Sequence, residues 1–90
     1  MKYRCTYITG DSKENDGGIW EKKETLKIII FTCIEKSFFA VDYDKFYCKK
    51  DNSGKHHITD WKDDTYTVYP NRCGTPHIFE SIGENNENSK

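Results

Sequence analysis

The residues of this chain that could bind a metal ion are its cysteines and histidines. Structural zinc takes four such ligands, usually supplied as closely spaced pairs on turns. The nearest pair is Cys73 and His77, with three residues between them, and Cys48 and His57 flank a polar turn from which they could complete a tetrahedral set. No two cysteines are separated by two or four residues, the spacing typical of zinc-binding turns. We therefore expect no metal or other cofactor, with Cys48, His57, Cys73 and His77 as the alternative zinc site.

Four cysteines could also form disulfides or supply a nucleophile. They permit three pairings, among which the sequence does not choose. The chain starts with its own Met and its first residues lack an apolar signal segment, so we expect a cytoplasmic protein with reduced thiols. A catalytic Cys73–His77 pair would need a third orienting group, and no nucleophile or phosphate-loop motif occurs. We expect no enzymatic activity and no catalytic residues. The four cysteines are Cys5, Cys33, Cys48 and Cys73.

Aromatic side chains suggest a different chemistry, the binding of another protein. The chain has 2 Trp, 6 Tyr and 5 Phe, more rings than a core of this size should enclose. Exposed Tyr and Trp contribute strongly to interface energies. Rings next to polar turns are the best candidates for exposure, and a neighbouring lysine would add charge. The predicted partner-binding residues are Trp20, Tyr47, Lys49, Trp61 and Tyr69.

Nucleic-acid or nucleotide binding is the alternative function. Residues 43–50 alternate rings with lysines and face His56, His57 and Trp61 across a turn, an arrangement that small β modules use to stack bases. However, 14 Lys and Arg against 15 Asp and Glu give a net charge of −1, which is low for a nucleic-acid binder. The same balance excludes a strongly acidic mimic of DNA.

The elements that must position these residues are strands. Nine Ile, eight Thr and the many rings stand against one Leu and one Ala, and branched or ring side chains fit a pleated sheet better than a helix. Residues 2–9 and 65–69 alternate apolar and polar positions, as half-buried strands do. Residues 51–54 (DNSG) form a strong turn signal. Further strands are predicted at 26–34, 37–41, 43–50, 56–61 and 77–82, and a mobile loop at 10–18.

These elements predict one small all-β domain over residues 1–82, followed by a disordered polar tail at 83–90. The short connections favour an antiparallel meander or curled sheet of about six strands. Segment 26–34 carries apolar residues on both faces and is expected to lie in the centre of the sheet. The alternative is an α+β fold with a short helix near 41–50, since Tyr43, Phe46 and Tyr47 also fit helical spacing.

One part of the chain resembles proteins of a known kind. Residues 60–71 (DWKDDTYTVYPN), with Gly74-Thr75-Pro76 and Phe79-Glu80, resemble the closing hairpin of small phage and mobile-element accessory proteins. Anti-CRISPR proteins and other anti-defence inhibitors come from this group. The resemblance implies a phage-encoded inhibitor that acts in the bacterial cytoplasm. It would bind a defence nuclease complex, such as a CRISPR-Cas complex, stoichiometrically and without catalysis, through surface complementarity because the chain is nearly neutral.

Overall fold

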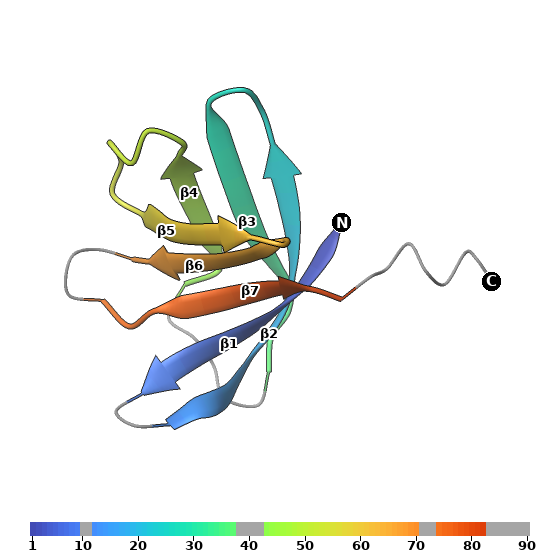
Figure 1. The fold of residues 1–90 in the computed structure, drawn as a ribbon. Helices are drawn as coiled ribbons and strands as arrows, with labels where there is room; N and C mark the ends of the chain where they lie inside the picture. The colour runs from blue at the N-terminus through green and yellow to red at the C-terminus, as the bar shows by residue number, and fades with distance from the viewer. Residues whose placement is uncertain (10–11, 38–42, 71–73, 83–90) are drawn as a thin grey trace.

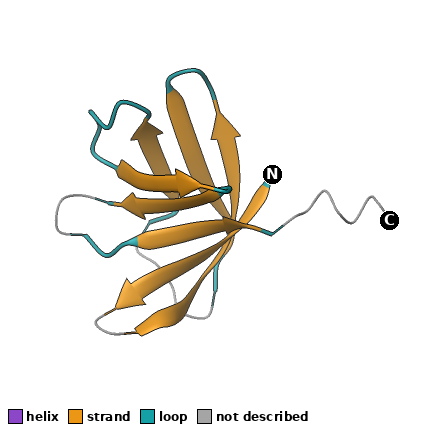
Figure 2. Ribbon diagram, in the orientation of Figure 1, coloured by secondary structure: helices purple, strands orange, loops and turns teal. Residues whose placement is uncertain are grey.

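Strands make up all the regular secondary structure that is described in the computed structural model of the chain. The described residues are 1–9, 12–37, 43–70 and 74–82, and they contain no helix (Figure 2). The predicted all-β fold is therefore confirmed. Seven strands follow one another along the chain: β1 (Lys2–Thr9), β2 (Ser12–Glu24), β3 (Ile28–Glu35), β4 (Lys45–Lys49), β5 (His57–Lys62), β6 (Thr65–Tyr69) and β7 (His77–Ser81).

The seven strands form one sheet that curls almost into a barrel (Figure 1). Their order is β4-β3-β2-β1-β7-β6-β5, and all hydrogen-bonded neighbours are antiparallel. The chain thus forms two meanders, β1 to β4 and β5 to β7, joined where β1 pairs with β7. When seven strands lie in antiparallel order, the first and the last run in the same direction. The strands at the two ends of this order, β4 and β5, are therefore parallel to each other. A parallel bridge between Cys48 and His56 connects them.

The prediction of a mobile loop at 10–18 is wrong from Ser12 onward, where the chain forms the first half of β2. Ser12 pairs with Thr9, and Asp16 pairs with Thr6, so the polar segment that begins at Ser12 is the first half of a long strand. Pairing with β1 outweighs its turn-forming composition. The second half turns toward β3 at Gly18, whose φ is 94°. A Cβ there would overlap the carbonyl oxygen of Glu35, so the close approach of β2 and β3 requires glycine.

Rings fill the interior of the barrel. Phe31 stacks on Phe79 with their centroids 4.2 Å apart, and Trp20 stacks on Phe46 at 5.4 Å. Inward positions alternate with outward ones along each strand, as the pleat requires. Most described aromatic side chains therefore belong to the core and not to the surface. The buried apolar residues are Tyr3, Cys5, Trp20, Ile29, Phe31, Phe46, Cys48, Ile58, Tyr66, Val68 and Phe79.

The alternating strands at 2–9 and 65–69 are confirmed within these bounds. The strand predicted from residue 26 begins at Ile28, because Thr25 closes a turn: its Oγ1 accepts hydrogen bonds from the amides of Ile28 (3.0 Å) and Lys27 (3.3 Å). The alternative helix near 41–50 is wrong where the chain is described, since residues 45–49 form β4. Most of the strand predicted at 37–41, and the tail at 83–90, lie outside the described residues.

Candidate functional site

The outer face of β3 and β4 carries a row of apolar side chains. Ile28 and Ile30 alternate with the buried positions Ile29 and Phe31 and so point away from the barrel, and exposed Ile34 follows at the register shift near the end of β3. Ile30 lies directly opposite Tyr47 of β4, which places both side chains on the same face. Ile34 is 49% exposed and Tyr47 53% exposed, and Leu26 in the β2–β3 turn is 93% exposed. We call Leu26, Ile28, Ile30, Ile34 and Tyr47 the β3–β4 patch.

Four exposed lysines surround this patch. Lys23 of β2 is the cross-strand neighbour of Ile30, and Lys27 follows Leu26 in the turn. Lys45 and Lys49 lie on either side of Tyr47 along β4, and the Lys45 ammonium is 5.6 Å from the centre of the Tyr47 ring. Exposed Glu35 follows Ile34, and exposed Asp44 precedes Lys45, so the border of the apolar centre carries both signs of charge with lysine in excess.

A pocket of about 430 Å³ continues the patch at one end. It lies between the β2–β3 turn and the turn that follows β4. The second turn is fixed by Asp51, whose Oδ1 accepts a hydrogen bond from the Ser53 amide at 3.0 Å, and by Asn52 at a φ of 60°. The pocket lining is Leu26, Lys27, Ile28, Lys49, Lys50, Asp51 and Ser53.

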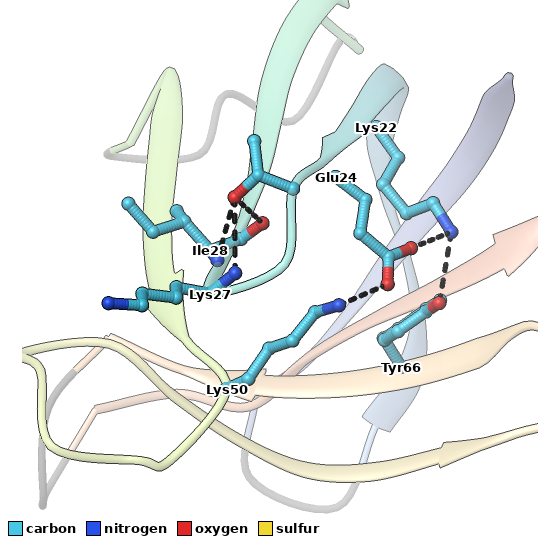
Figure 3. A network of polar contacts seen from close by, with 7 residues as sticks. Lys22, Glu24, Lys27, Ile28, Lys50 and Tyr66 are labelled. Atoms are coloured by element: carbon cyan, nitrogen blue, oxygen red, sulfur yellow. Dashed lines mark hydrogen bonds and ion pairs between the residues drawn. The ribbon is translucent and has the colours of Figure 1, made fainter.

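A polar network holds the end of β2 in place beside this pocket (Figure 3). The Lys22 ammonium donates hydrogen bonds to the Tyr66 hydroxyl at 3.0 Å and to Glu24 at 3.2 Å, and Lys50 forms an ion pair with the same carboxylate at 2.7 Å. Hydrogen bonds from Lys50 and Lys22 lower the pKa of Glu24 below its ordinary value. Burial alone would lower the pKa of Lys22, but its hydrogen bonds, that to Tyr66 first, raise it instead. Because Lys22 and Lys50 are engaged here, the exposed lysines are the ones a partner can reach.

His56 covers part of the outer edge of β4. Its Nδ1 lies 3.0 Å from both the amide nitrogen and the carbonyl oxygen of Tyr47, so the ring can accept from the first or donate to the second, depending on its tautomer. The ring also packs edge-on against Phe46, with the centroids 5.1 Å apart. Burial lowers the pKa of His56, while its contact with the Tyr47 backbone partly offsets this effect.

The structure brings together two of the five predicted partner-binding residues. Exposed Tyr47 belongs to the β3–β4 patch, and exposed Lys49 is one of the four lysines around it. The expected exposure of Trp20 is wrong: its ring is 0% exposed, and its Nε1 donates to the carbonyl oxygen of Gly17 at 2.9 Å. Tyr69 is half-buried on β6, which lies near the opposite end of the strand order from β4. The Trp61 side chain lies outside the described part of the structure.

The alternative zinc ligands have other surroundings. Cys48 is buried in the core, and buried His77 has its Nδ1 2.7 Å from the carbonyl oxygen of Thr75. His57 is half-buried on β5, and Cys73 lies outside the described residues. Within the described ranges, no group of three or more His, Cys, Asp or Glu side chains could hold a metal ion.

The described cysteines, Cys5, Cys33 and Cys48, carry free thiols. Burial raises the pKa of all three, that of Cys48 to about 12. Because the thiolate is the reactive form of cysteine, the buried thiols of Cys5 and Cys48 are poorly suited to nucleophilic chemistry.

The sequence prediction missed the leucine and the three isoleucines of the patch, and three of the four lysines around it. The signal was present, because consecutive isoleucines make both faces of β3 apolar. A strand with two apolar faces is usually covered on both sides, and for this reason the sequence predicts a central position for residues 26–34. In a single curled sheet only the inner face is covered, so the second apolar face of β3 remains outside.

Comparison of the chain with models of protein families, with curated proteins and with solved structures gives no significant match. Among the described residues, no helix is long and apolar enough to cross a membrane.

Proposed function

We propose that this protein is a non-catalytic binding module that docks another protein on the β3–β4 patch. The observation that carries the proposal is the row of isoleucines on the outer face of β3, which no other described layer covers. Contiguous exposed apolar side chains with a polar border are typical of protein interaction sites. Tyr47 adds an aromatic ring to the centre of the patch, and such rings often dominate interface energies.

The charges around the patch define the chemistry of the partner. Lys23, Lys27, Lys45 and Lys49 would face carboxylates at the border of the interface, while an apolar group of the partner would cover the isoleucines. Such charge complementarity increases the association rate and selects the correct partner. The proposed partner is therefore a protein with an acidic surface around an apolar centre.

Protein binding fits this face better than nucleic-acid binding does. Single-stranded nucleic acids stack their bases on several rings. Among the side chains that the structure describes, Tyr47 is the one exposed ring, and isoleucines offer no flat surface for stacking.

The resemblance to anti-defence proteins supplies a class of partner for this proposal. In that case the protein is a phage-encoded inhibitor, and the partner is a subunit of a bacterial defence nuclease complex. The lysine border suits an acidic protein surface and would be repelled by a positively charged nucleic-acid channel. We therefore propose inhibition by occupation of an acidic assembly surface.

A capture experiment with matched variants tests this function. Ile30→Asp places a negative charge in the patch, whereas Ile78→Asp makes the same change on the outer face of β7, where Ile78 is half-buried like Ile30. Immobilised wild type and both variants are exposed to lysate from bacteria that carry a defence nuclease complex. The proposal predicts a protein that wild type and Ile78→Asp retain and Ile30→Asp loses. Equal recovery by all three, or recovery of only single-stranded nucleic acid, would contradict it.

A further inference from the structure

We propose that the edge of β4 receives an extended acidic segment of the partner as an additional strand. This inference rests on the proposed function and specifies how the same site recognises its partner. Residues 45–49 lie at one end of the strand order and pair with β3 on one side. Sheet edges of this kind bind extended peptides through main-chain hydrogen bonds.

The hydrogen bonds between β3 and β4 show which backbone groups face outward. The Cys33 amide donates to the carbonyl of Asp44, and the Lys50 amide donates to that of Lys27, both at 2.9 Å. Hydrogen-bonded pairs alternate with non-bonded pairs along an antiparallel ladder. The N–H and C=O groups of Lys45, Tyr47 and Lys49 therefore point away from β3. The contact of His56 with the Tyr47 backbone agrees with this direction.

Strand β5 leaves the first half of this edge uncovered. The bridge between β4 and β5 pairs Cys48 with His56, and β5 starts at the next residue, His57. Because the two strands run in the same direction, β5 continues beyond the end of β4 and not back along it. The bridge at Cys48, whose own N–H and C=O face β3, uses the flanking C=O of Tyr47 and N–H of Lys49. The outward groups that β5 leaves are the N–H and C=O of Lys45 and the N–H of Tyr47, and the last of these is bonded to the His56 ring.

The outward side chains of β4 define the added segment. Lys45, Tyr47 and Lys49 share the outer face, and Lys45 and Tyr47 lie on the half of the edge that β5 leaves uncovered. An added strand would therefore place an acidic residue beside Lys45 and an apolar residue beside Tyr47. A second copy of this chain is a poor occupant. Antiparallel pairing of two β4 strands about Tyr47 would place Lys45 of one copy opposite Lys49 of the other, and like charges directly opposite each other are unfavourable.

His56 must leave its place when the strand adds. Its ring occupies the position at Tyr47 where a backbone group of the incoming strand would bind. We therefore expect His56→Ala to bind the acidic segment more tightly than wild type does, because no side chain then has to be displaced.

The test uses a synthetic peptide with the sequence Gly-Thr-Glu-Thr-Ile-Thr-Glu-Thr-Gly, blocked at both ends, and a matched peptide with Lys at both Glu positions. Each is titrated into the full-length, isotope-labelled protein, and binding is followed by NMR. The Glu peptide should shift the amide signals of residues 45–47 and bind at least tenfold more tightly than the Lys peptide. A titration without shifts in these signals, or with equal affinity for both peptides, would overturn the proposal.

Backbone pairing is tested separately from charge. Lys45→Pro removes one outward N–H but no bond to β3, and Lys45→Ala removes the same charge while it keeps that N–H. We expect Lys45→Pro to bind about tenfold more weakly than Lys45→Ala. If Lys45→Pro does not fold, two Glu peptides that are N-methylated on the two alternate sets of residues replace it. Only one set can face β4, so equal affinity of the two peptides would refute strand addition.

The result also separates this inference from the proposed function. If the protein captured from lysate is lost with Ile30→Asp but Lys45→Pro and Lys45→Ala retain it equally, the partner docks on the patch without adding a strand. If Ile30→Asp retains that protein, the patch itself is not the docking surface.

Discussion

Replacement of Gly18 by alanine tests how β2 bends into the barrel. Gly18 has a φ of 94°, a conformation in which an alanine is strained. The added Cβ would overlap the carbonyl oxygen of Glu35 and would lie 3.1 Å from both the Cα of Lys36 and the amide nitrogen of Ser37. All three neighbours are backbone atoms, so none can move aside as the end of a flexible side chain would.

The expected cost of Gly18→Ala follows from these two effects. Left-handed backbone costs a non-glycine residue about 1–2 kcal/mol, and overpacking against fixed atoms typically adds about 1–3 kcal/mol. The free energy of unfolding should therefore fall by about 2–5 kcal/mol, out of the roughly 5–13 kcal/mol expected for a domain of this length. The melting temperature should fall by at least about 10 °C.

Thermal and urea unfolding, followed by circular dichroism, measure this loss. Gly54→Ala is the matched control, because its Cβ would lie 3.5 Å from the Cγ of Lys49, an ordinary contact, and Gly54 does not have a positive φ. The control should be within about 1 kcal/mol of wild type, since it chiefly restricts the unfolded chain. If the two variants melt within a few degrees of each other, the bend in β2 does not depend on Gly18 and this account of it is wrong.

Three further predictions concern the core, the thiols and the seam between β4 and β5. Phe31→Ala should lower the free energy of unfolding by about 3–5 kcal/mol, measured by urea unfolding, because Phe31 is fully buried against Phe79; a loss below about 1 kcal/mol would contradict the packing. Cys48, whose pKa burial raises to about 12, should not react with a disulfide reagent at pH 8 until urea unfolds the protein, and rapid labelling of the native state would contradict its burial. The pKa of His56 lies below its ordinary 6.5 in the folded protein, so the unfolded chain takes up the proton first and stability should fall as the pH drops through about 6.5. His56→Gln should weaken this pH dependence in urea unfolding, and an unchanged dependence would exclude His56 as its source.

The parts of the fold that were predictable are those in which local pattern and long-range pairing agree. β1 and β6 alternate apolar and polar residues, and the turn at 51–54 has Asp, Asn and Gly in positions that favour it. The first half of β2 was not predicted because the residue types within Ser12–Asp16 do not favour a strand. This segment forms a strand because it pairs with β1. Such pairing depends on contacts distant in sequence and overrides local propensity.

The candidate site was predictable only in part, for a related reason. Tyr47 and Lys49 were found because they precede a polar turn, where exposure is common. Trp20 also lies next to a polar segment, but its ring turns inward because Trp20 is the cross-strand partner of buried Tyr3 and so shares the inner face of the sheet. The isoleucines of β3 could not be assigned to an inner or outer face, since that requires knowledge that a single layer closes on itself.

The outer face of β3 and β4 is the docking surface that we propose for a protein partner. The most direct measurement is the affinity of the captured partner for wild type, Ile30→Asp and Ile78→Asp by calorimetric titration. Loss of a central interface residue typically costs 2 kcal/mol or more, which corresponds to about 30-fold in affinity. We predict at least this loss for Ile30→Asp and less than about threefold for Ile78→Asp. Equal affinities for the two variants would contradict the claim.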